Sequence, residues 1–200
     1  MKKTLAIISS ILLLDQLVKI YVKLNFTYGE EINVMGNWFK LHFTENNGMA
    51  YGIELGGDMG KLFLSVFRIV FVMGIGWYLF KLNKQKADSL YIVTIALIFA
   101  GAVGNIIDSV FYGVIFSNSG FDTLAQLFPA EGGYSSFLHG KVVDMLYFPL
   151  IEGHFPDWFP FWGSEEFIFF RPVFNIADMS ISVGVGLIIL FQKRFFDETK

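Results

Sequence analysis

Four long apolar stretches dominate the pattern of hydrophobic and polar positions along the chain. They cover about residues 5–22, 62–80, 90–112 and 173–191. Each approaches the roughly 20 apolar residues that a helix needs to cross the hydrocarbon core of a bilayer. The pattern therefore predicts a membrane all-α bundle with four transmembrane helices, forming a single integral membrane domain over residues 1–200.

The first stretch also allows a second interpretation. Lys2 and Lys3 precede an apolar run, an arrangement that is typical of a cleaved secretory signal peptide. No small-x-small cleavage pattern follows the run, and the helical pattern continues through Asp15 and Lys19. We therefore expect a helix that is retained.

Basic residues gather before the first stretch, between the second and third, and after the fourth. They are Lys2, Lys3, Lys81, Lys84, Lys86, Lys193, Arg194 and Lys200. The two long links, 25–61 and 113–172, carry few basic residues. Because cytoplasmic segments are enriched in Lys and Arg, we expect both termini in the cytoplasm and both links on the opposite side of the membrane.

The two long links carry structure of their own. Between residues 31 and 52, apolar and polar positions are mixed and are broken by Gly36, Asn37 and Asn47, which predicts short strands. From 116 to 172 the chain is rich in aromatic residues, Gly and Pro, a composition that suits the headgroup layer. We expect a small extracytoplasmic β-sheet and an interfacial segment.

Composition limits the chemistry that the chain can perform. It is 54% hydrophobic and 16% charged, with a net charge of −3 and no basic patch, which argues against nucleic acid as a partner. It has no Cys, and its three His residues lack the HExxH spacing. We therefore expect no thiol nucleophile, no metal site and no cofactor.

Six ionisable residues lie in or beside apolar sequence, where inserting each one costs about 2.5–3.5 kcal/mol. They are Asp15, Lys19, Arg68, Asp108, Asp144 and Asp178. Asp15 and Lys19 are four residues apart and share a helix face. They can form an intrahelical ion pair or, as an alternative, contact a substrate.

Other polar residues have ordinary explanations that compete with functional ones. Asn105 and Asp108 follow Gly101 and Gly104, so they can form polar contacts between closely packed helices. Arg68, near the outer end of the second stretch, can snorkel to the interface.

Two asparagines and a glycine flank the candidate acids. Asn46 and Gly48 fit a turn, although an Asn can also hold a substrate backbone or orient a carboxylate. Asn175 lies three residues before Asp178, which places both on the same side of a helix start.

Asp144 and Asp178 both lie in apolar surroundings at the expected outer face of the membrane. They can be two independently hydrogen-bonded residues. If instead they face each other, repulsion and desolvation raise one pKa and leave the other low. One carboxylate could then activate water while its protonated partner donates to a scissile carbonyl.

Five segments in this chain follow the order found in lipoprotein signal peptidases, the type II signal peptidases. They are DQLVK at 15–19, NNGMAYG at 46–52, GNIID at 104–108, VVDM at 142–145 and FNIADMSIS at 174–182. The chain resembles this family over nearly its whole length. The resemblance implies an intramembrane-surface aspartic endopeptidase that removes the signal peptide from diacylglyceryl-modified prolipoproteins, cutting before the lipidated Cys.

The resemblance also implies roles for particular residues. It makes Asp144 and Asp178 catalytic. Supporting or substrate-binding positions fall on Asp15, Lys19, Asn46, Gly48, Asn105, Asp108 and Asn175. It further implies location in the bacterial cytoplasmic (inner) membrane, an active site on the extracytoplasmic side and inhibition by the cyclic peptide globomycin. We expect a monomer whose partners are the prolipoprotein and membrane lipid.

The chain departs from the family pattern in two places. Ser109 stands where an Arg usually follows the GNxxD motif, and Arg171 is a candidate source of the missing charge. Residues 113–140 form an insertion before the first catalytic aspartate. The sequence leaves open whether this insertion is a lid, a docking surface or an interfacial segment.

Two other classes of membrane protein remain as alternatives. A carrier or proton-coupled channel would string its acidic residues across the membrane, whereas here they gather toward one face. A non-catalytic scaffold would tolerate Asn in place of both aspartates.

Overall fold

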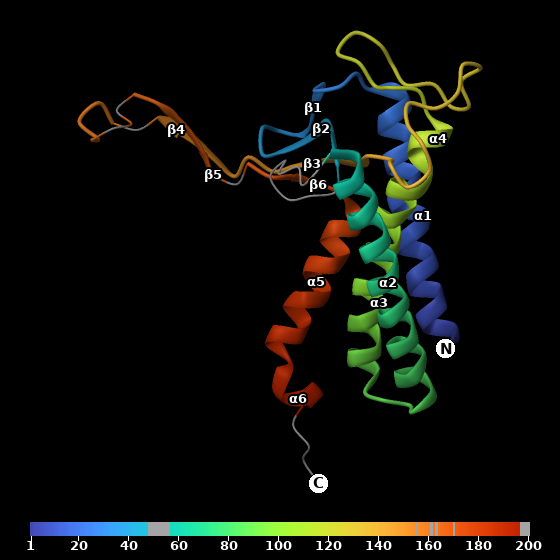
Figure 1. Ribbon diagram of the computed structural model, residues 1–200. Helices are drawn as coiled ribbons and strands as arrows, with labels where there is room; N and C mark the ends of the chain where they lie inside the picture. The colour runs from blue at the N-terminus through green and yellow to red at the C-terminus, as the bar shows by residue number, and fades with distance from the viewer. Residues whose placement is uncertain (48–56, 155, 161, 163, 170, 197–200) are drawn as a thin grey trace.

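Three long helices stand side by side, and a small sheet lies across one end of them (Figure 1). The computed structural model describes residues 1–196 except 48–56, 155, 161, 163 and 170. The long helices are α1 (Lys2–Asn25), α2 (Gly57–Lys84) and α3 (Ser89–Ile107), the last extended by a π-helical turn, η2 (Asp108–Tyr112), and by α4 (Gly113–Ile115). In the described part of the chain, three helical spans are long and apolar enough to cross a membrane.

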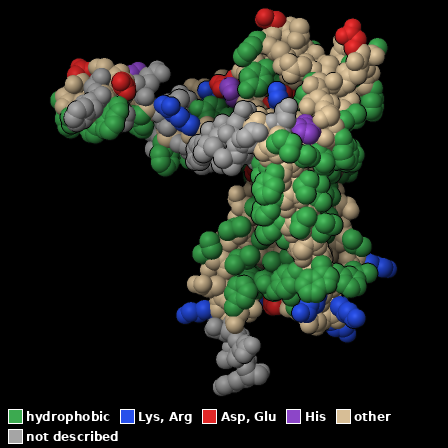
Figure 2. All heavy atoms as spheres, viewed as in Figure 1, with side chains coloured by type: hydrophobic (Ala, Val, Ile, Leu, Met, Phe, Trp, Pro, Cys, Tyr) green, Lys and Arg blue, Asp and Glu red, His purple; other side chains and the backbone are tan. Residues whose placement is uncertain are grey.

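The long helices turn apolar side chains outward. On α2, Phe63, Phe67 and Phe71 recur every four residues, stack along one face and stay exposed. Figure 2 shows hydrophobic side chains around the middle of the bundle and basic ones at the end opposite the sheet. Such a surface is unfavourable in water and favourable in lipid, so this is a membrane protein.

The fourth predicted helix, placed at about 173–191, is shorter in the structure and begins at Ile176. Val173–Phe174 forms strand β6, Asn175 caps the helix, and α5 runs over Ile176–Leu190. Its 15 residues span about 22 Å at 1.5 Å per residue, less than the roughly 30 Å of a bilayer core. A short helix, α6 (Gln192–Phe196), follows it.

The predicted small sheet is confirmed, but β3 comes from the second link and β6 from the predicted start of the fourth helix. Its order is β1-β2-β3-β6, with every neighbouring pair antiparallel. The strands are β1 (Glu31–Met35), β2 (Phe39–Asn46), β3 (Val142–Tyr147) and β6. The VVDM segment is thus the central strand β3, next to the strand that leads into α5.

A second pair of strands, β4 (Ile151–His154) and β5 (Glu166–Phe169), forms a hairpin that projects sideways from the sheet (Figure 1). Trp158 and Trp162 lie in the connection between these strands and are exposed. The hairpin extends across the direction of the helices at the level of the sheet.

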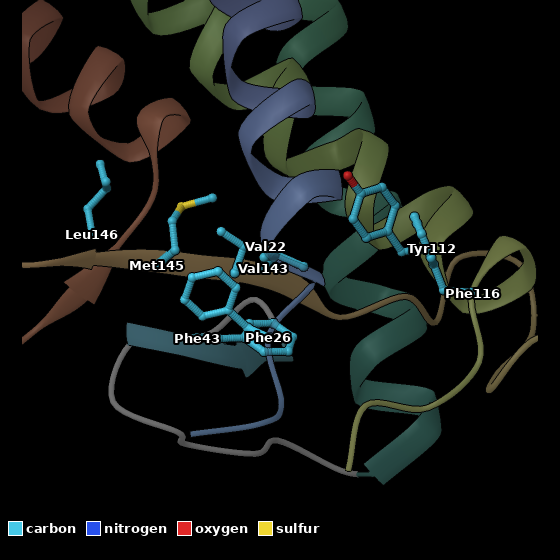
Figure 3. Packing of buried hydrophobic residues seen from close by; sticks show 8 residues of the cluster. All are labelled: Val22, Phe26, Phe43, Tyr112, Phe116, Val143, Met145 and Leu146. Carbon is cyan, nitrogen blue, oxygen red and sulfur yellow. The ribbon is translucent and has the colours of Figure 1, made fainter. Parts of the chain in front are cut away.

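One hydrophobic cluster joins the sheet to the nearby ends of the helices (Figure 3). Its buried members are Val22, Phe26, Phe43, Tyr112, Phe116, Val143, Met145 and Leu146. They come from α1, β2, β3, η2 and the start of the insertion, so packing of this cluster sets the position of β3 relative to the helices.

Close packing between α3 and α5 depends on small residues. A Cβ atom on Gly101 would lie 2.2 Å from the carbonyl oxygen of Ala177. A Cβ on Gly104 would lie 2.8 Å from Oδ2 of Asp15 and 3.1 Å from Cβ of Ala177. The absence of side chains at these two glycines therefore allows α1, α3 and α5 to meet at one level.

Candidate active site

Asp144 lies in the middle of β3 and is 3% exposed. Asn175 Nδ2 donates to its Oδ1 over 2.7 Å, and Asn46 Nδ2 donates to its Oδ2. Burial, together with the negative charge of Asp178, raises the pKa of Asp144 to about 8, against the opposing effects of Lys19 and the two amides. The Asp144 carboxyl is therefore largely protonated at neutral pH.

Asp178 lies in the first turn of α5, where a capping box holds it. Its backbone N–H donates to Asn175 Oδ1 over 2.9 Å, and its Oδ2 accepts from the Asn175 N–H over 3.3 Å. Asn105 Nδ2 donates to its Oδ1 over 2.8 Å. Amide donors and the N-terminal end of a helix therefore surround the Asp178 carboxyl group.

Asn175 connects the two aspartates. It is fully buried, and its amide group bonds the Asp144 carboxyl at 2.7 Å while its carbonyl oxygen accepts from Asp178 N–H. Its Nδ2 also donates to Asn105 Oδ1 over 3.0 Å and to the Val143 carbonyl over 3.2 Å. Two acids that sequence spacing could not place together thus share one partner and interact electrostatically.

A fully buried ion cluster lies next to the two aspartates. Lys19 Nζ is 3.0 Å from Asp15 Oδ2 and 2.8 Å from Asp108 Oδ2, and all three side chains are 0% exposed. Lys19 also donates to Asn105 Oδ1 over 2.9 Å, which orients the amide that donates to Asp178. The predicted intrahelical pair is present, and its complete burial speaks against direct contact with a substrate.

Two members of this polar network escaped the sequence analysis. Gln16 Nε2 donates to Asp108 Oδ1 over 2.9 Å and to Asp15 Oδ2 over 3.1 Å. Tyr112 OH in turn donates to Gln16 Oε1 over 3.1 Å. The sequence contains features that could have identified both residues. Gln16 is a polar residue inside an apolar stretch, and Tyr112 lies one helical turn after Asp108.

Two backbone amides tie the ion cluster to the neighbouring elements. The N–H of Val143 on β3 donates to Asp108 Oδ2 over 3.2 Å, and the N–H of Ala177 on α5 donates to Asp15 Oδ1 over 2.9 Å. Asp144 and Asp178 each follow one of these residues in the chain. The ion cluster therefore holds the two segments that carry the aspartates.

The remaining predicted residues are placed as follows. Arg68 on α2 interacts electrostatically with Asp178, so snorkelling alone does not describe it. Ser109 Oγ donates to the Asn105 carbonyl of its own helix over 3.0 Å, and Arg171 is exposed. Gly48 lies outside the described residues.

The donor set suits acid–base chemistry better than metal binding. Among the described residues, no group of three or more His, Cys, Asp and Glu side chains is arranged to hold a metal ion. Two carboxyl groups held by one residue, Asp144 by the Asn175 side-chain amide and Asp178 by the Asn175 backbone N–H, can donate and accept a proton in turn. Two carboxyl groups in one site at the ends of membrane helices are what a membrane aspartic peptidase would require.

Comparison with known proteins gives the family. The family model Peptidase_A8, described as signal peptidase (SPase) II, matches residues 7–194. The chain is 53% identical over 195 residues to the lipoprotein signal peptidase of Porphyromonas gingivalis, covering 96% of this chain and 84% of the relative. It is 40% identical over 183 residues to that of Amoebophilus asiaticus, covering 90% and 73%. This chain belongs to the signal peptidase II family.

Solved structures agree on the fold. Two structures of bacterial membrane enzymes match all of this chain, with TM-scores of 0.65 and 0.63 at 23% and 24% identity, and cover 93% and 96% of the matched chains. With family membership established, the chain is an aspartic endopeptidase that removes the signal peptide from prolipoproteins.

Proposed function

We propose that Asp144 and Asp178 are the catalytic pair of this peptidase, with Asp178 as the general base and Asp144 as the general acid. The observation that carries the proposal is the shared partner: Asn175 bonds both aspartates from the N-cap of α5. Asn175 bonds the Asp144 carboxyl through its side-chain amide and the Asp178 carboxyl through its backbone N–H, which keeps the two carboxyl groups in one site, where repulsion makes simultaneous ionisation unfavourable.

The assignment of acid and base rests on the surroundings of each carboxyl. Asp144 is buried, with its pKa raised to about 8, so it carries the proton at neutral pH. Asp178 is half-buried, lies at the helix N-terminus and interacts with Arg68, and we assign it the role of general base because Asp144 is the proton donor. The macroscopic titration belongs to the pair as a unit.

The reaction follows from these protonation states. Asp178 takes a proton from a water molecule, whose oxygen attacks the scissile carbonyl carbon, while Asp144 gives its proton to the carbonyl oxygen. The resulting gem-diol collapses as the C–N bond breaks: Asp178 returns its proton to the leaving amine, and Asp144 recovers a proton from a diol hydroxyl. Both acids end as they began, and one water has been consumed.

The substrate is a diacylglyceryl-modified prolipoprotein, cut before its lipidated Cys. The aspartates lie where the sheet meets the ends of the helices, a level at which water can reach a peptide whose acyl chains remain in lipid. The signal peptide helix then lies beside the bundle. The signal peptide and the lipidated Cys both reach the site from the membrane rather than from solution.

The proposed topology has both termini in the cytoplasm of the bacterial cell, in its inner membrane, with the sheet and active site outside. The N-terminal end of α1 and the short helix α6 lie on the side of the bundle away from the sheet. Figure 2 shows basic side chains gathered there. That asymmetry supports the orientation. In this proposal α5 crosses as a fourth, short helix, and residues 1–200 form one integral membrane domain.

The sideways hairpin is proposed to rest in the outer headgroup layer. Its connection exposes Trp158 and Trp162, residues that favour the membrane–water interface. We also propose that the enzyme acts as a monomer with membrane lipid around it, and that globomycin inhibits it by occupying the site of the two aspartates.

Cleavage of a lipidated precursor tests the catalytic pair. Asp144→Asn and Asp178→Asn each keep the size of the side chain and remove its proton chemistry, so each should abolish cleavage while the protein still inserts into membranes. Asp122→Asn is the matched control, since Asp122 is an exposed aspartate of the insertion. Full activity in either site variant would refute the proposal, as would equal loss in the control.

A further inference from the structure

A second buried ion pair lies outside the active site. Lys23, near the end of α1, is 0% exposed, and its ammonium group contacts the carboxylate of Glu45, whose side chain is 1% exposed. Lys23 Nζ also bonds Ser119 Oγ at 3.0 Å. The rings of Phe116 and Tyr134 lie 5.4 and 5.0 Å from Nζ, within reach of cation–π attraction.

Three parts of the chain meet at this ion pair: α1, strand β2 and the insertion 113–140. Ser119, Phe116 and Tyr134 all belong to the insertion. Two apolar side chains would fill this site without the desolvation cost of two charges. The buried ion pair is therefore better explained by the specific arrangement of α1, β2 and the insertion that it imposes. The insertion therefore fastens β2 to the end of α1.

The insertion is itself held firmly at this place. The Gly120 carbonyl accepts from Tyr28 N–H over 2.8 Å, and Gly140 N–H donates to the Ser109 carbonyl over 2.8 Å. Gly133 approaches so closely that a Cβ there would lie 2.2 Å from the Gly113 carbonyl oxygen. These contacts fix the insertion against η2, α4 and the segment that follows α1.

Strand register connects the ion pair to the active site. Glu45 pairs with Val143, and Thr44 pairs with Asp144. Because successive side chains of a strand point to opposite faces, Glu45 and Asn46 point in opposite directions. Glu45 shares its face with Val143, which packs in the hydrophobic cluster of Figure 3, whereas Asn46 shares its face with Asp144 and donates to it.

We propose that Lys23, Glu45 and Ser119 are positioning residues of the active site, which fix the rotation of β2 so that Asn46 holds the Asp144 carboxyl. This rests on the proposed function. Asn46 is the last residue of β2, where no further residue of the strand fixes its position. The buried ion pair of the preceding residue, Glu45, fixes the backbone there instead. The insertion therefore affects catalysis by positioning Asn46 and not by contacting the substrate.

The test compares Glu45→Gln with a matched control. Glu45→Gln should lower kcat about tenfold with little change in KM, because a misplaced amide affects the chemical step more than binding. Glu31→Gln makes the same change on β1, where Glu31 pairs with Lys40 and His42 at the surface, and should leave kcat unchanged.

The pH profile supplies a readout that general destabilisation would not move. The charged groups that face Asp144 are Asp178 from α5 and Lys19 from α1, and neither is altered by the variant. Donation by Asn46 lowers the pKa of Asp144, so a displaced Asn46 should move the alkaline limb of kcat to higher pH. An unmoved limb would contradict the proposal.

A double-mutant cycle with Asn46→Ala decides between positioning and an independent effect. If Glu45 acts through Asn46, Glu45→Gln should add little to the loss already caused by Asn46→Ala. A full further tenfold loss would overturn the proposal. Should Glu45→Gln fold poorly, Ser119→Ala serves instead with a smaller loss and the same non-additivity. An active Asp144→Asn would refute the proposed function itself, whereas an additive cycle would refute only this inference.

Discussion

Removal of the Lys19 ammonium group should destabilise the protein more than any other single loss of charge in α1. Lys19→Met keeps the length of the side chain but leaves Asp15 and Asp108 buried with no positive charge between them. Their oxygens lie 3.0 and 2.8 Å from Lys19 Nζ, and all three side chains are 0% exposed. Solvent cannot compensate for the lost charge.

The expected magnitude is that of breaking a buried ion pair, about 3–5 kcal/mol of unfolding free energy. The loss should fall toward the lower end because Gln16 and the backbone amides of Val143 and Ala177 still donate to the two carboxylates. Activity should fall too, since Lys19 orients the Asn105 amide that donates to Asp178.

Reversible unfolding in detergent micelles measures this quantity. Lys2→Met is the matched control on the same helix, where Lys2 is exposed, and should change the free energy of unfolding by less than about 0.5 kcal/mol. Adding Asp15→Asn and Asp108→Asn to Lys19→Met should recover much of the stability, because it removes the unpaired charges. A Lys19→Met protein as stable as the control would refute this account of the ion cluster.

Further predictions concern packing and the hidden polar contacts. Gly101→Val should push α5 away from α3 and abolish cleavage, since even a Cβ there would lie 2.2 Å from the Ala177 carbonyl oxygen; Gly74→Val, where a Cβ meets nothing within 4 Å, should remain active in the same cleavage assay. Tyr112→Phe should cost about 0.5–1.5 kcal/mol in detergent unfolding, because Gln16 Oε1 loses its donor in a half-buried site; an unchanged free energy of unfolding would show that this hydrogen bond contributes nothing.

The sequence predicted the helical bundle well because apolar length is a strong signal in a membrane protein. It did not resolve the segment that begins near residue 173, where the same apolar character continues through a strand, a cap and a helix. Hydrophobic runs alone do not separate a buried strand from a buried helix. The capping residue Asn175 marks the true boundary, and its role as a cap becomes visible only with Asp178 three residues later.

The candidate site was predicted in part, for a different reason. Polar residues in apolar sequence identified Asp15, Lys19 and Asp108, but not that they form one cluster. Pairing of β2 with β3 joins segments about a hundred residues apart, and local pattern carries no information on such pairing. The buried pair of Lys23 and Glu45 was missed because each residue alone looks like an ordinary charge near the end of an element.

The central claim is that two carboxyl groups share one proton at the membrane surface, and the pH dependence of cleavage tests it most directly. The measurement is kcat/KM for a lipidated prolipoprotein between pH 4 and about 10, with product size read on gels. Because the pKa of Asp144 is raised to about 8, its proton is retained below that pH and lost above it. We expect a rate that falls about tenfold per pH unit above about 8, where the Asp144 proton is lost. A rate that stays constant up to pH 10 in a folded enzyme would contradict it.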